Sequence, residues 1–575
     1  MKYPFIMMAL SLTASLTQCD EQKRNVSGSD RAWWKEEIIY QIYPRSFKDS
    51  DGDGVGDLRG IIQKLDYIKD LGVTAVWLNP IYSSPNDDNG YDVSDYRGIM
   101  RDFGTMADFD EMLEGMHARG IKLVMDMVLN HSSDEHEWFR RSRSSRDNPY
   151  RDYYHWWPAE KGKPPYRYSL FDEKGDAWKY DSATNAYYLH YFSVKQPDLN
   201  WENPKVRQEV YDIMRFWADK GVDGFRLDAF QFAAKDTAFP EFPNLSHKNF
   251  IEYYAMQPGL HEYLQEMNRE VFSKYKVMTV AEGAGRNFED AHNLVDADRN
   301  ELQMAYAFDA VDIAKVDGYD LGDLKKIFSR WDSAFASDGW LSIFLANHDQ
   351  ARLVSRFGND RPEFRIPSAK MLNTFILSMR GTPYCYYGDE LGMTNLSMQT
   401  IEEYKDIAAI NGYKKVVGEG GDVDEYMRVL RFSSRDNGRT PMQWNDETHA
   451  GFTTGTPWLP VNENYRTLNV AVESGDPNSV LNHFKAMVAL RKARPVLIYG
   501  EYQLVQPEHP AVYAYTRALD GVKALVLLNF TQDVSNIELP KIRMGSTWIN
   551  NYEDLKREGD LVLLQPYQAV IVELE

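Results

Sequence analysis

Apolar residues in the first two thirds of the chain alternate between helical spacing and short unbroken runs. The first helical face is predicted for Leu58, Ile61, Ile62, Leu65 and Ile68, which recur at intervals of three and four residues. A glycine usually separates such a helix from the apolar run that follows it, as expected at a helix end. The runs predict buried strands over residues 73–78, 121–125, 221–228, 277–281, 341–346 and 383–387.

This alternation predicts an α/β fold built on parallel strands. Thr105 and Asp108 form a predicted capping box at the start of the second helix, which Gly120 ends. We favour a (β/α)8 TIM barrel over a doubly wound sheet, because no glycine-rich phosphate turn follows any early strand.

Two regions interrupt the alternation. Residues 132–200 lack helical periodicity and are rich in Arg, Tyr, Trp and Pro, which predicts a domain inserted after the third strand. Beyond residue 500 the pattern becomes strand-like, and Asp520-Gly521 between two apolar runs predicts a hairpin. We therefore expect a barrel over residues 31–131 and 201–498, an inserted domain over 132–200, and a C-terminal antiparallel β-sandwich over 499–575.

Composition narrows the possible partners. The chain has 575 residues and a net charge of −21, with acidic and basic residues interspersed. This charge argues against nucleic acid or an anionic membrane surface as a partner, but not against a neutral ligand. The 14 Trp and 36 Tyr are suited to stacking on sugar rings, although most large aromatic residues fill cores.

The N-terminal residues 1–30 are predicted to be a signal or lipoprotein segment followed by a polar tether. Lys2 precedes an apolar stretch that is too short to span a membrane. Leu16-Thr-Gln-Cys19 resembles a bacterial lipoprotein cleavage box, with Cys19 as the lipidated residue, and plain secretion is the alternative. We expect the protein in the bacterial cell envelope, either in the periplasm or as an outer-membrane lipoprotein.

Acidic, histidine and arginine residues follow four of the predicted strands. The strand ends carry Asp126 with His131, Arg226 with Asp228, Glu282, and His348 with Asp349. In a barrel the carboxyl ends of all strands converge on one mouth. Alternation along a strand places Arg226 and Asp228 on the same side, where the guanidinium would keep the carboxylate ionised as a candidate nucleophile.

Together these motifs resemble the α-amylase family of glycoside hydrolases, and finer matches resemble its α-glucosidase and oligo-1,6-glucosidase branch. The family motifs are Asp126-Met-Val-Leu-Asn-His131, Gly224-Phe-Arg-Leu-Asp228, Glu282 and Asn347-His-Asp349. The branch motifs are Tyr40-Gln-Ile-Tyr-Pro44, Ser84-Pro-Asn-Asp-Asp-Asn-Gly-Tyr91, Gln196-Pro-Asp-Leu-Asn200 and Arg439-Thr-Pro-Met-Gln-Trp444. Ala281-Glu-Gly283 departs from the pattern, because a Gly-Glu pair is common at the acid and Ala281 takes the place of that Gly.

The resemblance implies roles for three carboxylates in a retaining reaction. Asp228 would attack the anomeric carbon, Glu282 would act as acid and then base, and Asp349 would stabilise the transition state. It also implies a set of substrate-binding residues, in which Asp88 and Arg435 cap the glucose and enforce exo-action. The set is Asp88, Tyr91, His131, Arg226, Ala229, His348 and Arg435. Arg439 is the alternative candidate for the role of Arg435.

An acidic, glycine-rich loop predicts a cation site. Oxygen donors recur at every second residue through Asp49, Asp51, Asp53, Val55 and Asp57, with Val55 contributing its carbonyl by resemblance. Carboxylates in such a turn suit Ca²⁺, and less often Mg²⁺, in a structural role. An EF-hand is excluded because its twelfth position would be Gly60 rather than Glu. No organic cofactor is expected.

Two motifs disagree on which glucosidic linkage, α-1,4 or α-1,6, the protein would cleave. Gln196-Pro-Asp-Leu-Asn200 resembles the oligo-1,6-glucosidase version, which would act on isomaltose and panose. Ala229 follows the nucleophile where Val accompanies α-1,6 action in the branch, and we therefore favour an exo-acting α-1,4-glucosidase for maltose and short malto-oligosaccharides. The alternatives are the oligo-1,6-glucosidase, a sucrose isomerase or other α-glucosyl transferase, and more remotely a non-catalytic transporter-associated homologue.

Overall fold

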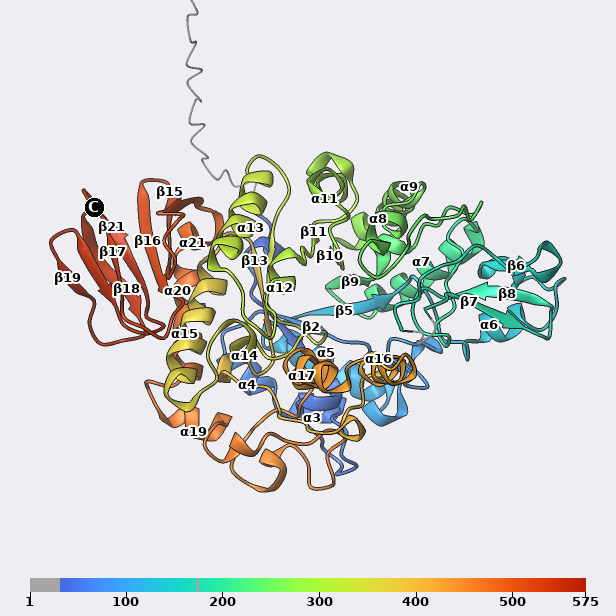
Figure 1. Ribbon diagram of the computed structural model, residues 1–575, viewed down its shortest axis with the longest axis horizontal. Coiled ribbons are helices and arrows are strands. Elements are labelled where there is room, and N and C mark those ends of the chain that lie inside the picture. Colours follow the sequence, from blue (N-terminus) through green and yellow to red (C-terminus); the bar gives the residue numbers. More distant parts are fainter. Residues whose placement is uncertain (1–30, 172–174) are drawn as a thin grey trace, which may run out of the picture.

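Eight parallel strands form a nearly closed barrel at the centre of the protein (Figure 1). In this computed structural model, residues 31–171 and 175–575 are described. The hydrogen-bonded order is β11-β10-β9-β5-β2-β1-β13-β12, and the Ser342 hydroxyl donates to the Ala305 carbonyl across the seam between the end strands. The strands are β1 (Ile39–Ile42), β2 (Ala75–Leu78), β5 (Lys122–Val128), β9 (Gly224–Asp228), β10 (Met278–Ala281), β11 (Met304–Ala305), β12 (Ser342–Ile343) and β13 (Thr382–Tyr386).

The predicted barrel is confirmed, with differences in single elements. The first predicted helix is two helices, α3 (Leu58–Gln63) and α4 (Leu65–Asp70), because Lys64 leaves the helical conformation at φ −111° and ψ 7°. The predicted capping box is present at the start of α5 (Met106–Ala118). The other long helices around the barrel are α7 (Pro204–Asp219), α9 (Leu260–Met267), α13 (Leu321–Ala334), α15 (Pro362–Ser378) and α20 (Val480–Ala493).

The segment between β5 and α7 carries a small sheet that lies beside the barrel, at the right of Figure 1. Its strands β6 (Trp156–Pro158), β7 (Trp178–Asp181) and β8 (Ala186–Leu189) pair antiparallel in the order β6-β8-β7. An isolated bridge between His131 and Asp198 joins the start of this segment to its end. The insertion therefore returns to the barrel next to a predicted site residue.

The C-terminal residues form two antiparallel sheets that share one hydrophobic core. The five-stranded sheet comprises β14 (Glu501–Val505), β15 (Val512–Leu519), β16 (Val522–Asn529), β21 (Ala569–Leu574) and β18 (Met544–Asn550), and the smaller one β17 (Ser535–Glu538), β20 (Leu561–Leu564) and β19 (Lys556–Glu558). The predicted hairpin turn is present, with positive φ at both Asp520 (48°) and Gly521 (84°). Val512, Leu527, Ile537 and Val562 pack between the two sheets.

Helices α16 (Ile407–Gly418) and α17 (Val423–Ser433) follow the last barrel strand and pack against each other around Met427 and Leu430. In the described part of the chain, no helix combines the length and apolarity needed to cross a membrane. The predicted signal segment 1–30, including Cys19, lies outside the described residues.

Candidate active site

Arg226 is the centre of a buried cluster of carboxylates at the carboxyl end of the barrel. β9 presents Arg226 and Asp228 on the same side, and the neighbouring strands β5 and β10 supply Asp126 and Glu282. Nη1 of Arg226 donates to Asp228 Oδ1 at 2.5 Å and to Asp126 Oδ1 at 2.8 Å. Nη2 lies 2.9 Å from Glu282 Oε1. One guanidinium therefore holds the predicted nucleophile and the predicted acid side by side.

Burial and charge oppose each other in this cluster. Burial raises the pKa of Asp228 well above its usual value, and Arg226 acts against that rise. Burial likewise raises the pKa of Asp126 to about 6, with Arg226 and the Tyr91 hydroxyl lowering it. Three carboxylates around one guanidinium favour retention of a proton within the cluster. Such a proton is what a general acid must deliver.

Asp349 lies in a more positive environment than Asp228. Its Oδ1 accepts from Arg435 Nη1 at 3.0 Å and from Arg439 Nη2 at 3.1 Å. Nε2 of His348 lies 3.3 Å from its Oδ2. Although burial pushes the pKa of Asp349 upward, His348 and the two arginines together lower it below its usual range. Asp349 is therefore held ionised.

A hydrogen-bond chain fixes the ring of His348. Gln41 Nε2 lies 2.9 Å from His348 Nδ1 and 2.9 Å from Asn79 Oδ1. With the amide donating to Nδ1, the proton of the neutral ring resides on Nε2, which faces Asp349. Burial lowers the pKa of His348 to about 3, which keeps the ring neutral at pH 7.

The predicted cap of the glucose site is present as a pair between Asp88 and Arg435. Nη2 of Arg435 lies 3.3 Å from Asp88 Oδ1, whereas Arg439 contacts Asp349 and the His348 carbonyl. Arg435 makes its shortest contact with Asp406, at 2.5 Å, and a second one at 3.0 Å. Burial raises the pKa of Asp88 to about 7, with Arg435 lowering it.

Tyr91 and His131 line the same side of the site. The Tyr91 ring stacks on the His348 ring, with centroids 5.2 Å apart, and its hydroxyl donates to Asp126 at 2.9 Å. His131 Nε2 lies 3.1 Å from the side-chain nitrogen of Gln196, which is also 3.3 Å from Asp88 Oδ2. The Gln196 motif therefore reaches the cap of the glucose site directly.

Ala229 touches the predicted acid through its backbone. It has left-handed φ and ψ angles of 47° and 19°, and its amide donates to Glu282 Oε2 at 2.9 Å. The residue is buried beside the acid. Its position therefore affects both the wall of the site and the orientation of Glu282.

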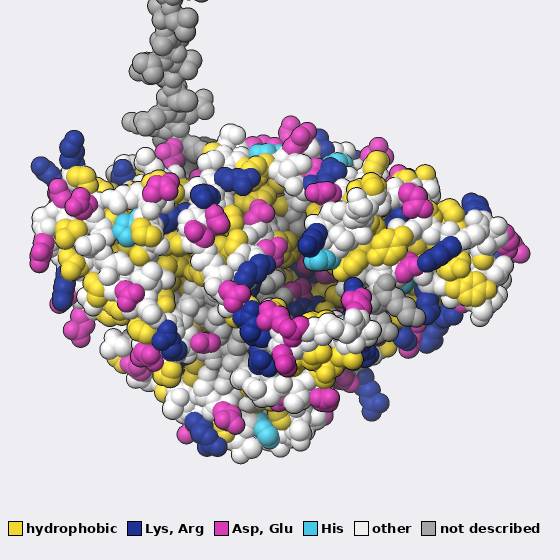
Figure 2. All heavy atoms as spheres, viewed as in Figure 1, with side chains coloured by type: hydrophobic (Ala, Val, Ile, Leu, Met, Phe, Trp, Pro, Cys, Tyr) yellow, Lys and Arg dark blue, Asp and Glu magenta, His cyan; other side chains and the backbone are white. Residues whose placement is uncertain are grey.

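A cavity of about 680 Å³ opens next to Glu282, the predicted acid. Its wall contains both aromatic and charged side chains, and the aromatic ones include Phe192, Phe232, Phe288 and Trp331. A volume of this order accommodates more than one small group. Figure 2 shows that one face of the molecule is hollowed near its centre, with acidic and basic side chains gathered around the hollow.

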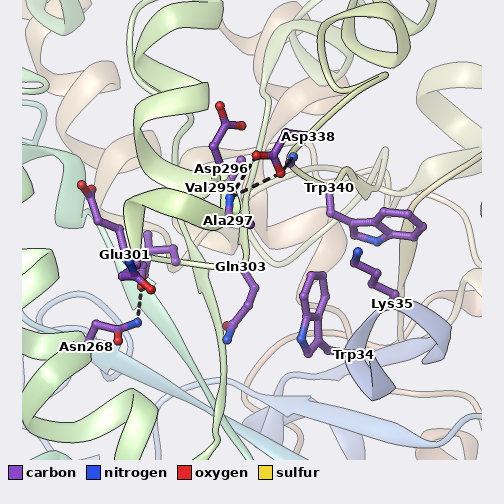
Figure 3. A pocket seen from close by; sticks show the side chains of 13 residues that line it. Trp34, Lys35, Asn268, Val295, Asp296, Ala297, Glu301, Gln303, Asp338 and Trp340 are labelled. Atoms are coloured by element: carbon purple, nitrogen blue, oxygen red, sulfur yellow. Dashed lines mark hydrogen bonds between the residues drawn. The ribbon is translucent and has the colours of Figure 1, made fainter. Parts of the chain in front are cut away.

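A second pocket lies at the opposite end of the barrel, and its lining contains none of the predicted catalytic residues (Figure 3). Its lining includes Trp34, Gln303 and Trp340, which precede barrel strands rather than follow them. Its volume is about 240 Å³. The Glu301 carboxylate in its wall is already paired with His261 and with Arg299 at 2.8 and 3.0 Å.

The acidic loop before α3 brings three of its predicted ligands together. Asp49, Asp51 and Asp57 each place a carboxylate oxygen within 4.8 Å of the others. Asp53 lies outside this trio, and its Oδ1 accepts from the Val55 amide at 2.8 Å. Three convergent carboxylates fit the hard oxygen donors that Ca²⁺ prefers, so the chemistry of the donor set is compatible with the predicted cation.

Sequence reasoning missed several residues that complete the site. Gln41, Asn79, Gln196 and Asp406 were assigned no role, although all four are buried and hydrogen-bonded to predicted site residues or their neighbours. Gln41 and Gln196 occur within motifs that carried the family resemblance, which was an available signal. No sequence signal pointed to Asp406, because an Asp before a predicted helix is interpreted as an N-cap. Asp406 does cap α16, by accepting a hydrogen bond from the Ala408 amide.

Comparisons with known proteins agree with this geometry. Residues 41–500 match the α-amylase catalytic domain. The chain is 51% identical over 561 residues to an oligo-1,6-glucosidase from Parageobacillus thermoglucosidasius, covering 95% of this chain and 99% of that protein. It is 43% identical over 560 residues to an α-glucosidase from Pediococcus pentosaceus, covering 94% and 99%. The chain therefore belongs to the α-amylase family of glycoside hydrolases.

Similar solved structures include a trehalulose synthase and an isomaltulose synthase. The trehalulose synthase MutB from Pseudomonas mesoacidophila MX-45 superimposes with a TM-score of 0.92 at 44% identity, covering 95% of this chain and all of that one. The isomaltulose synthase PalI from Klebsiella sp. LX3 gives the same values. These two structures therefore share the fold of this chain over 95% of its length.

Proposed function

We propose that the protein is a retaining, exo-acting α-glucosidase that removes glucose from the non-reducing end of short α-glucosides. The observation that carries this proposal is the single guanidinium of Arg226 between Asp228 and Glu282. It fits a mechanism in which a nucleophile and an acid act on the same anomeric centre from closely spaced positions.

Asp228 attacks the anomeric carbon while Glu282 donates a proton to the leaving oxygen. The ion pair with Arg226 supports the ionised form of Asp228 against its burial. Glu282, now a carboxylate, then takes a proton from water, which attacks the glucosyl ester and frees Asp228. Asp349 carries the negative charge that stabilises the oxocarbenium-like transition state.

The exo-action rests on the closed end of the glucose site. Asp88, Arg435 and Asp406 form a contiguous charged group behind the glucose position. The Phe171 ring lies 5.1 Å from the Arg435 guanidinium and adds to this wall. A chain that continued beyond the non-reducing glucose would collide with it, so starch should be a poor substrate.

For the linkage we now favour α-1,6 over α-1,4. Ala229 lies directly beside the acid, but Gln196 also reaches the site, through Asp88 and His131. The size of residue 229 alone therefore does not decide the linkage. Relatives from Parageobacillus thermoglucosidasius and Bacillus cereus, 51% and 47% identical, are named oligo-1,6-glucosidases, which supports isomaltose-type substrates.

The test is a comparison of kcat/KM for isomaltose, maltose and sucrose with purified protein, together with chromatography of the products. We expect isomaltose to exceed maltose. The opposite order would restore the α-1,4 proposal. Sucrose is included because MutB and PalI share 44% of the sequence, and a sucrose isomer as the main product would identify an isomerase instead. A covalent glucosyl adduct with a fluorinated substrate should form on Asp228, and an adduct elsewhere would exclude the mechanism.

We further propose that Asp49, Asp51 and Asp57 hold a structural Ca²⁺, with Asp53 and the Val55 carbonyl as additional donors from the same loop. The loop precedes α3, whose N-cap is Asp57, so the cation would hold this turn against the barrel.

The location proposed from residues 1–30 is the bacterial envelope, with Cys19 lipidated. Fractionation should place the protein with membranes, and Cys19→Ala should release it into a soluble fraction. An intact Met1 on cytosolic protein would exclude export.

A further inference from the structure

Gln231 is a polar side chain of the cavity beside Glu282 that lacks the pairing several of its neighbours have. Trp331 Nε1 donates to Asp309 at 2.7 Å, and Arg286 is paired with Asp290 at 2.7 Å. Gln231 also lines this cavity and is only 7% exposed. Its amide oxygen is buried and makes no hydrogen bond within residues 31–171 and 175–575. An unpaired buried amide oxygen is unusual and costly in a folded protein.

The fold places this amide beside the residue that follows Glu282. Gln231 lies in the short 3-10 helix (Phe230–Phe232) that begins two residues after Asp228. Strand β10, which leads to Glu282 and Gly283, pairs directly with β9. The loops after the two strands therefore meet, and Gln231 and Gly283 pack against each other at the exit from the acid.

Gly283 provides the space that the amide occupies. A Cβ at position 283 would lie 2.2 to 2.5 Å from the side-chain amide atoms of Gln231, which is closer than real Cβ atoms approach. Gly283 also has a φ of 91°, a conformation that favours glycine. A side chain at position 283 would therefore exclude the Gln231 amide from the place that it occupies beside the loop after the acid.

We propose that Gln231 is a specificity-determining residue that hydrogen-bonds a hydroxyl of the departing sugar and so selects hydroxylated leaving groups over aromatic ones. A hydroxyl both donates and accepts, and it can therefore pair with the amide whichever end faces the cavity. The wall also contains aromatic side chains, among them Phe232 and Phe288, which can pack against a sugar or an aryl group. This inference rests on the proposed glucosidase function and identifies a determinant of its substrate class.

The test compares isomaltose with p-nitrophenyl α-glucoside. The aryl leaving group of the second substrate has no free hydroxyl group before cleavage. Gln231→Met keeps an unbranched side chain of similar length and removes both polar atoms. We expect kcat/KM for isomaltose to fall about 10- to 100-fold, mostly through KM, because one buried hydrogen bond is lost. The value for the aryl glucoside should change less than about threefold, since it never made that bond.

Gln208→Leu, on the exposed surface of α7, is the matched control and should leave both substrates unchanged. Gln231→Leu is a second variant in case the first is unstable, and thermal unfolding of each variant measures folding separately. Equal losses on both substrates, or no loss on either, would overturn the proposal. Failure of the wild-type protein to hydrolyse any glucoside would instead reject the proposed function. If it cleaves another disaccharide better, that disaccharide replaces isomaltose in the comparison.

Discussion

Replacing Arg226 with lysine tests whether one guanidinium organises the catalytic carboxylates. Arg226 is fully buried and contacts Asp126, Asp228 and Glu282 at 2.8, 2.5 and 2.9 Å through two different nitrogens. A lysine ammonium keeps the charge but replaces the planar fork with a single point. It cannot reach all three carboxylates in the same geometry, so at least one charge-assisted contact is lost.

Each hydrogen bond to a charged group contributes about 1.5–3 kcal/mol. Loss of one such contact that is also needed in the transition state would reduce kcat/KM by about 10- to 150-fold. Arg226 also lowers the pKa of Asp228. A less well placed cation lets that pKa rise, so the acidic limb of the kcat/KM profile should move to higher pH.

The assay is hydrolysis of p-nitrophenyl α-glucoside by Arg226→Lys across the acidic pH range, with thermal unfolding measured in parallel. Arg428→Lys, at an exposed ion pair with Asp317 and Glu425, is the control for an arginine-to-lysine change. A folded Arg226→Lys protein with kcat/KM within threefold of wild type and an unmoved acidic limb would refute the role given to the guanidinium.

Two further predictions concern the cap of the glucose site and the cation. Asp406→Asn retains an N-cap for α16, so Tm should change little. It weakens two contacts with Arg435, at 2.5 and 3.0 Å, and KM should therefore rise about tenfold or more. An unchanged KM would show that Asp406 does not contribute to substrate binding. Chelation should lower Tm, because a cation at 100 times its Kd adds about 2.7 kcal/mol to the free energy of unfolding. Asp49→Asn should abolish that response to chelator and Ca²⁺, and a chelator-independent wild-type Tm would exclude the cation.

The barrel could be predicted because its strands and helices have distinct apolar periods. β2 is buried along its whole length and reads as a continuous apolar run, whereas β9 is equally buried but carries Arg226 and Asp228 of the site. β1 and β11 were missed. β11 contains only two residues, and β1 alternates polar Gln41 with apolar neighbours because that side chain serves the site.

The residues of the candidate site could be predicted where they lie at the end of a barrel strand. Residues that reach the site from a distant part of the sequence were much harder to predict. Asp228 ends β9, Glu282 directly follows β10, and Asp349 lies in the segment after β12. The carboxyl ends of these strands meet at one end of the barrel. Asp406 reaches Arg435 from the start of α16, and no periodicity connects those two positions. Gln231 was overlooked because a glutamine after an apolar run carries no pattern, and its unpaired oxygen beside Gly283 is visible only in the folded structure.

The choice of linkage depends on more than the size of the residue after the nucleophile. Ala229 has a left-handed backbone at φ 47°, and its amide orients Glu282. A β-branched residue is strained in that conformation, so Ala229→Val would disturb the acid as well as narrow the wall. Gln196 contacts the cap of the glucose, and Gln231 faces the departing group. Selectivity is therefore set jointly by walls on both sides of the scissile bond, and each must be changed separately to assign its share.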